Sequence, residues 1–246
     1  MPREEQDFDK SITEEKAADI LDAIYQKALD GIPKVSRSIE DLADDYTNKF
    51  DTPERAAKEL VKYQVFKCGT SGFLTGLGGL ITLPVAVPAN IGSVLYVQMR
   101  MVAAIAKIGN YDVYSDQVQT LVYMCLTGSA ITDVVKRAGI KVGEKALTAT
   151  LKKLPGAALI KINQRIGFRL ITKFGEKGVI NLGKMIPLAG GVIGGAFDVA
   201  STSIIAKNAV RLFIEDEGPT GEGAAKAAAV EIEGTSMQEK EKEGKD

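Results

Sequence analysis

The sequence predicts an all-α fold, a compact multi-helix bundle, and three observations support this prediction. Apolar residues recur at helical spacing along most of the chain. Helix-capping residues precede several of these stretches, and glycine or proline follows them. The strand-like runs at 85–87 and 192–193 are short and lie among prolines and glycines, so we expect no sheet.

We expect a single domain over residues 11–214, because a chain of 246 residues can bury one good core. Residues 1–10 are polar and lack the apolar stretch of a signal peptide, which predicts a disordered N-terminus on the cytoplasmic side. Residues 215–246 hold ten acidic and four basic side chains with few apolar ones, which predicts a disordered acidic tail.

The first two predicted helices have clear beginnings and ends. Ser11 and Glu14 have the spacing of a capping box, and apolar residues follow on one helical face. Gly31 and Pro33 end this helix. A second, short helix fits residues 38–48, with a serine at its start.

Two later helices also begin at strong signals. Thr52 is a good N-cap, and the proline that follows it suits the first helical position. Ser115 precedes a helix that we expect to run from Asp116 to Arg137, with Gly139 as its stop.

The region between these helices is uncharged and apolar. No Asp, Glu, Lys or Arg occurs over the thirty-two residues 68–99. Pro84 and Pro88 break this run near its middle, because proline removes a helical hydrogen bond. We therefore expect an apolar hairpin over 69–107, with a return arm over 89–107.

The hairpin can be a membrane element or part of a core. About twenty apolar residues suffice to span a bilayer, but the two prolines and nearby Arg100 favour a re-entrant, interfacial or buried hairpin over a span. Pairs of glycines one turn apart permit close helix packing in either setting. The candidate packing residues are Gly72, Gly76, Gly190, Gly191, Gly194 and Gly195.

A strongly basic segment follows, with twelve basic and two acidic side chains over 136–184. Within it we expect a helix over 157–174, on which four cations recur every fourth residue beside an apolar ridge. Like charges at this spacing repel one another, so an anionic partner is a reasonable inference. The candidate lipid-binding residues are Lys161, Arg165, Arg169 and Lys173.

Three partners fit this cationic ridge. An anionic membrane surface would attract it, at about 1 kcal/mol for each cation near the leaflet. Solvent, or the chain's own acidic tail, would also satisfy it. We expect no nucleic-acid partner, because the segment lacks interleaved exposed aromatics and any recognisable reader motif.

The absence of histidine restricts the chemistry that this chain could perform. It excludes nucleophile pairs that need an imidazole base and the usual zinc sites, and we expect no metal or cofactor. Cys68 and Cys125 lie in apolar surroundings, which indicates buried free thiols.

Three isolated charges lie on otherwise apolar stretches: Arg100, Asp133 and Asp198. Such groups usually pair with one another or face water. We predict that Arg100 pairs with Asp133 or Asp198 and so holds the bundle together. A carboxylate that handles protons is the alternative for the two acids.

Four blocks of the sequence resemble the EcsC family of bacterial proteins. They read GFLTGLGGLITLPVAVPAN at 72–90, YVQMRMVAAIA at 96–106, QRIGFRLITKFG at 164–175 and PLAGGVIGGAFD at 187–198. The resemblance covers about residues 50–214. The gene of the family's namesake lies beside those of an ABC transporter, so the resemblance implies an accessory role near a membrane exporter. It implies no catalytic residues.

These observations together predict a non-catalytic, membrane-associated accessory protein that docks on the cytoplasmic leaflet of the inner membrane. An ABC transporter or another membrane protein is the expected partner, in support of transport or an envelope process. Two alternatives remain open: a soluble all-α interaction module whose hairpin is core, and a carboxylate-dependent hydrolase that acts at the membrane.

Overall fold

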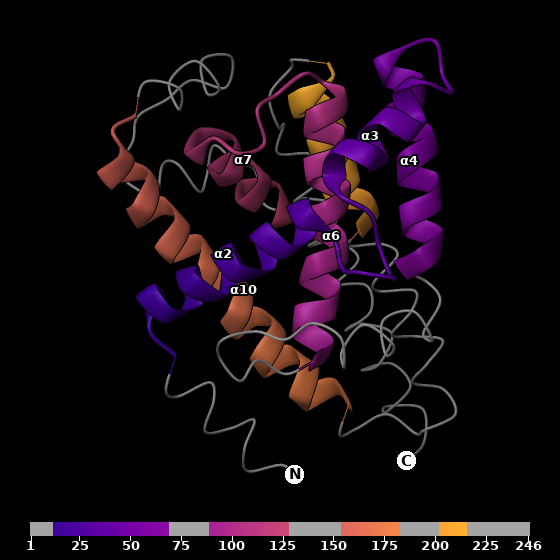
Figure 1. Ribbon diagram of the computed structural model, residues 1–246. Coiled ribbons are helices and arrows are strands. Elements are labelled where there is room, and N and C mark those ends of the chain that lie inside the picture. The colour runs from indigo at the N-terminus through magenta and orange to yellow at the C-terminus, as the bar shows by residue number, and fades with distance from the viewer. Residues whose placement is uncertain (1–11, 69–88, 128–153, 183–201, 216–246) are drawn as a thin grey trace, which may run out of the picture.

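The computed structural model describes residues 12–68, 89–127, 154–182 and 202–215. These residues form the predicted all-α fold (Figure 1), and within them the only β-pairing is an isolated bridge between Ile32 and Ser36. The packing glycines at 72, 76, 190, 191, 194 and 195, together with Asp133, Asp198 and both chain ends, lie outside the described residues.

Helix α2 (Glu14–Asp30) begins at Thr13, whose hydroxyl accepts a hydrogen bond from the Lys16 backbone N–H at 3.2 Å. The capping-box spacing had placed this start two residues earlier, at Ser11. The helix ends at Gly31 as predicted. Gly31 has φ of 82°, and the Ser36 carbonyl oxygen lies where a Cβ atom would stand, so only glycine fits this stop.

The next helix starts also follow the sequence signals. Helix α3 (Ile39–Thr47) has Ser38 as its N-cap, and the hydroxyl of Thr52 accepts from a backbone N–H in the first turn of α4 (Pro53–Cys68). Ser115 caps α7 (Asp116–Leu126), with its Oγ 3.4 Å from the backbone nitrogen of Val118. Helix α7 ends at Leu126, well before the predicted end at Arg137.

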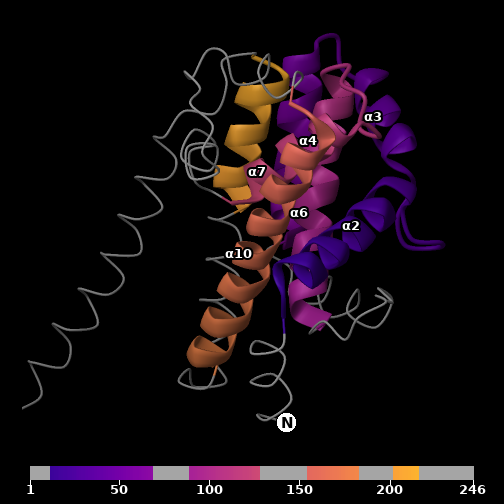
Figure 2. The same ribbon diagram turned by 90° about the vertical axis from the view of Figure 1, so that its left-hand side faces the viewer.

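Helix α6 (Ala89–Ile108) is the centre of the described bundle (Figures 1 and 2). It packs against α2, α3, α4 and α7, and its side chains from Leu95 to Ala106 are buried. This helix is the return arm of the predicted hairpin. The structure therefore places the apolar return arm in the core.

Helix α10 (Gly156–Leu182) lies along one side of the bundle (Figure 2) and packs on α2 and α7. Gly167 allows the close crossing with α2, because a Cβ atom there would stand 3.0 Å from the carbonyl carbon of Ala17. The helix extends beyond its predicted end at residue 174, since no proline follows until Pro187.

The helical residues 202–213 complete the described core behind α6 (Figure 1). Gln98 Nε2 donates a hydrogen bond to Thr202 Oγ1 at 3.3 Å. Tyr111, just after α6, packs edge-on against Phe213 with ring centroids 5.0 Å apart. The core also buries Cys125 as a free thiol, as predicted, and burial raises its pKa.

Candidate functional sites

The exposed side of α10 carries the predicted cationic ridge. Lys161 and Arg165 are exposed, Arg169 is half-buried, and the side chain of Lys173 lies outside the described residues. The three apolar residues that the helical period places on the other side are buried with 2% exposure each: Ile162, Ile166 and Leu170. The periodicity in the sequence therefore predicted correctly which side of this helix faces the core.

Apolar side chains accompany the cations on this exposed side. At 3.6 residues per turn, Ala157, Lys161, Arg165 and Phe168 fall within about 80° of one another around the helix. Phe168 is 37% exposed, and Ile160, beside this stripe, is 59% exposed. We call these five residues the outward face of α10. Its residues combine cationic groups with apolar surface.

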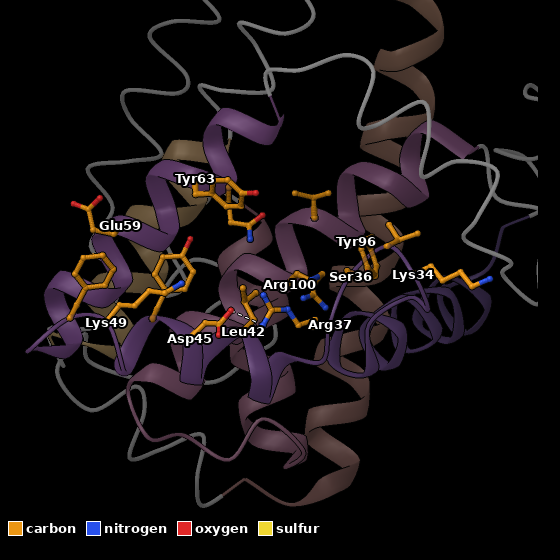
Figure 3. Close-up of a pocket in the computed structure, with 15 residues that line it drawn as sticks. Lys34, Ser36, Arg37, Leu42, Asp45, Lys49, Glu59, Tyr63, Tyr96 and Arg100 are labelled. Atoms are coloured by element: carbon orange, nitrogen blue, oxygen red, sulfur yellow. Dashed lines mark hydrogen bonds and ion pairs between the residues drawn. The ribbon is translucent and has the colours of Figure 1, made fainter.

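A second feature is a cavity of about 790 Å³, which we call the α3–α4–α6 pocket (Figure 3). Residues of these three helices, of the loop between α2 and α3 and of the loop between α3 and α4 line it, and none comes from α10. The pocket falls within the usual size range of small-molecule sites. Its lining residues are Lys34, Val35, Ser36, Arg37, Leu42, Asp45, Tyr46, Lys49, Phe50, Glu59, Tyr63, Gln64, Tyr96, Val97 and Arg100.

Arg100 is the most buried charged residue of this pocket, with 6% exposure. Its Nη1 donates a hydrogen bond to the backbone carbonyl of Ala28 at 2.9 Å, in the last turn of α2. The guanidinium carbon also lies 5.8 Å from the centroid of the Tyr96 ring. Burial lowers the pKa of Arg100, and Tyr96 partly offsets this effect.

No carboxylate among the described residues forms an ion pair with Arg100. The two partners predicted for it, Asp133 and Asp198, lie outside those residues, so that pairing stays a prediction. What the structure adds is the contact with Ala28, which places a cation at the C-terminus of α2. A cation is favourable there, because the last carbonyl groups of a helix are unsatisfied and carry partial negative charge.

The pocket has an excess of positive charge. Four basic side chains line it, at positions 34, 37, 49 and 100, against the two carboxylates of Asp45 and Glu59. Asp45 accepts from Arg37 at 2.8 Å, and Glu59 accepts from Lys62 at 2.6 Å. Both carboxylates therefore already have a cationic partner.

Hydrogen bonds fix the wall of the pocket near Arg100. The hydroxyls of Ser36 and Tyr96 lie 2.5 Å apart, and the Ile32 backbone N–H donates to Ser36 Oγ at 3.0 Å. Lys34, between them in the chain, has φ of 67° in a tight turn. The hydrogen bond between Ser36 and Tyr96 thus holds the loop after α2 against α6.

Hydrogen-bonded polar side chains also connect α2 and α7, and the sequence does not predict this network. Asp22 Oδ1 accepts from the Tyr123 hydroxyl at 2.7 Å and from Gln119 Nε2 at 2.9 Å. Partial burial raises the pKa of Asp22, and the bond from Tyr123 opposes this. In the sequence Asp22 looks like any polar residue of an amphipathic helix, so no local pattern indicated this network.

The outward face of α10 carries no carboxylate, and both carboxylates of the pocket are already paired with cations. Within the described part of the chain, no cluster of three or more Cys, Asp or Glu residues is arranged to hold a metal. None of the described helices combines the length and the apolar character that crossing a bilayer requires. The arrangement favours binding, by a cationic and apolar helix face and by a cationic pocket.

A comparison of the sequence with models of known protein families identifies the family of this chain. A model of the EcsC protein family matches residues 5–214 of the chain. This range includes all the helices described above, so both the outward face of α10 and the pocket lie within the family region. Searches of the curated proteins and of the solved structures found no match.

Proposed function

The chain belongs to the EcsC protein family, and we propose that it is a non-catalytic accessory protein that docks on an anionic membrane surface through the outward face of α10. The observation that carries this proposal is the exposure of cations and large apolar side chains on one helix face. Interfacial helices bind membranes through this combination, since apolar groups enter the headgroup region while cations meet anionic lipids.

Burial explains why we assign the docking surface to α10 and not to the return arm of the hairpin. The described part of the return arm is core, with Leu95, Met99 and Val102 at 0% exposure. Its apolar side chains cannot reach lipid without opening the bundle. Docking by α10 needs no such rearrangement, because Ile160 and Phe168 are already exposed.

The energetics are those of a reversible, peripheral association. Each cation near an anionic leaflet contributes about 1 kcal/mol, and burying an exposed aromatic side chain contributes about 1–2 kcal/mol. Lys161, Arg165 and Phe168 together would give weak binding that other membrane contacts can reinforce. We propose that such contacts come from a membrane protein, an ABC transporter or another component of the envelope.

Flotation with lipid vesicles tests this proposal. We expect the protein to float with vesicles that contain phosphatidylglycerol, to stay behind with phosphatidylcholine alone, and to detach as salt rises, because salt screens the charges. The double variant Lys161→Gln/Arg165→Gln should lose about tenfold or more in vesicle affinity, since two cations are removed. Phe168→Ser should weaken binding without changing its salt dependence.

A matched control removes two other exposed cations. Lys58 on α4 and Lys207 in the helical residues 202–213 are both exposed, and neither belongs to α10. Lys58→Gln/Lys207→Gln changes the net charge equally and should float like the wild type. If both double variants lost binding to the same extent, net charge would explain the association and the outward face would have no special role.

A further inference from the structure

We propose that the α3–α4–α6 pocket binds a phosphate monoester with an apolar or aromatic body, and that Arg100 holds the phosphate. The inference goes beyond membrane docking, because the pocket and the outward face of α10 share no residue. It depends on three properties of the pocket: a buried cation, an excess positive charge and an aromatic wall.

The buried cation is the first argument. Arg100 lines the pocket with only 6% exposure, and it has no ion-pair partner among the described residues. A guanidinium group carries five N–H donors in a planar fork that suits phosphate oxygens. The Ala28 carbonyl and the Tyr96 ring use only part of this capacity.

Capping of α2 does not by itself account for Arg100. The C-terminus of a helix corresponds to about half a negative charge, which is less than the full charge of the guanidinium. A buried charge normally requires a full countercharge. A bound anion would supply it, and the pocket gives that anion a place beside Arg100.

The charge of the lining indicates what kind of anion fits. Four basic and two acidic side chains line the pocket, which leaves an excess of two positive charges. A phosphate monoester carries nearly two negative charges at neutral pH and would balance this excess. In Figure 3, Lys34 and Lys49 lie toward opposite ends of the lining, with Arg100 between them.

The aromatic wall indicates the rest of the ligand. Tyr46 and Phe50 stack with ring centroids 6.1 Å apart, and Tyr63 is 49% exposed although it lines the same pocket. Aromatic side chains of this kind bind flat or aliphatic groups by surface burial. A free inorganic phosphate would leave this wall unused.

Isothermal titration of the full chain with phenyl phosphate tests the proposal, with benzyl alcohol as an uncharged probe that carries the same phenyl ring. We expect phenyl phosphate to bind at least tenfold more tightly than benzyl alcohol. Arg100→Met should remove this preference, because it keeps an unbranched apolar stem and deletes the charged guanidinium group. Equal affinity for the two probes in the wild type would overturn the proposal.

A second variant keeps the test decisive if Arg100→Met fails to fold. Lys34→Gln/Lys49→Gln removes two exposed cations of the lining and leaves Arg100 in place. Its affinity for phenyl phosphate should fall several-fold, while Lys58→Gln/Lys207→Gln should bind like the wild type. Equal affinity in these two double variants would contradict a phosphate site in this pocket.

The predicted internal pairing of Arg100 provides a further outcome. If Asp133 or Asp198 neutralised Arg100, the wild type would bind no phenyl phosphate, whereas Asp133→Asn or Asp198→Asn would bind it. That result would overturn the proposal. Tight binding by the wild type, with no gain in either variant, would support it.

Vesicles distinguish two sources of the phosphate group. If a lipid headgroup is the ligand, vesicles of phosphatidic acid will displace phenyl phosphate, and if a soluble molecule is, they will not; either result supports the site. The readouts also separate this inference from the docking of α10. Arg100→Met should still float with vesicles that contain phosphatidylglycerol, and Lys161→Gln/Arg165→Gln should still bind phenyl phosphate.

Discussion

At the scale of single residues, Arg100 shows how a charge can be held inside an apolar helix. The residues around it on α6 are buried in the core, yet its guanidinium reaches the last turn of α2 and the edge of a pocket. The flexible arginine stem packs among apolar groups while the charged end reaches polar ones. Arg100 can thus stabilise the C-terminus of α2 and also bind the ligand that we propose for the pocket.

The isolated position of Arg100 was visible in the sequence, but its surroundings were not. Lys34, Ser36 and Tyr63 are separated from it by dozens of residues, and none belongs to a motif. The pocket exists because two loops and three helices meet, which depends on tertiary packing. In contrast, the exposure of Lys161 and Arg165 follows from helical periodicity alone, so it could be predicted.

The hydroxyl of Tyr25 gives a prediction at this scale. Tyr25 is 1% exposed, and its hydroxyl donates to the Val113 carbonyl at 2.7 Å, which connects α2 to the loop before α7. Tyr25→Phe would leave that carbonyl unsatisfied, and we expect a loss of about 1–2 kcal/mol in the free energy of unfolding, measured with urea.

The matched control for Tyr25 is Tyr46→Phe. Tyr46 is only half-buried, and its ring stacks on Phe50, so we expect this change to alter stability by less than about 0.5 kcal/mol. An equal loss in both variants would mean that removal of a hydroxyl, and not the bond to Val113, causes the effect.

At the scale of helices, capping residues carried most of the predictive information. Ser38, Thr52 and Ser115 are the residues before α3, α4 and α7, as the sequence indicated, because a cap is a local interaction. Capping residues could not show whether α6 lies in a protein core or in a membrane. A predominantly apolar helix can be buried in protein or in lipid, and the sequence pattern is the same in both.

Gly109 gives a prediction at this scale. It follows α6, and the Phe213 carbonyl oxygen lies where a Cβ atom would stand, so the end of α6 contacts the end of helix 202–213 directly. Gly109→Ala must push these backbones apart. We expect a loss of about 1–3 kcal/mol in the free energy of unfolding, measured with urea.

Gly156 provides the control for Gly109. It begins α10, and no atom lies within 4 Å of a Cβ built on it. Gly156→Ala should leave stability unchanged or raise it by up to about 1 kcal/mol, because alanine has less conformational freedom to lose on folding. Destabilisation by both changes would argue against the close contact at Gly109 as the cause.

At the scale of the whole molecule, one core unites segments that are distant in the sequence. Buried residues of α2, α6, α7, α10 and helix 202–213 belong to the same cluster. The two candidate sites lie on different parts of this core, since α10 does not line the pocket. We therefore expect that the proposed membrane docking and the proposed ligand binding can be altered separately. Within the described residues, the shared core is what connects the two sites.

A shared core predicts cooperative unfolding, because helices that bury a common set of side chains cannot unfold one at a time. The chain has no tryptophan, and Tyr25, Tyr96 and Tyr123 are buried on three different helices, so tyrosine fluorescence reports on the core. We expect urea transitions followed by tyrosine fluorescence and by far-ultraviolet circular dichroism to coincide. Gly109→Ala should shift both midpoints equally, whereas separate transitions would contradict a single core.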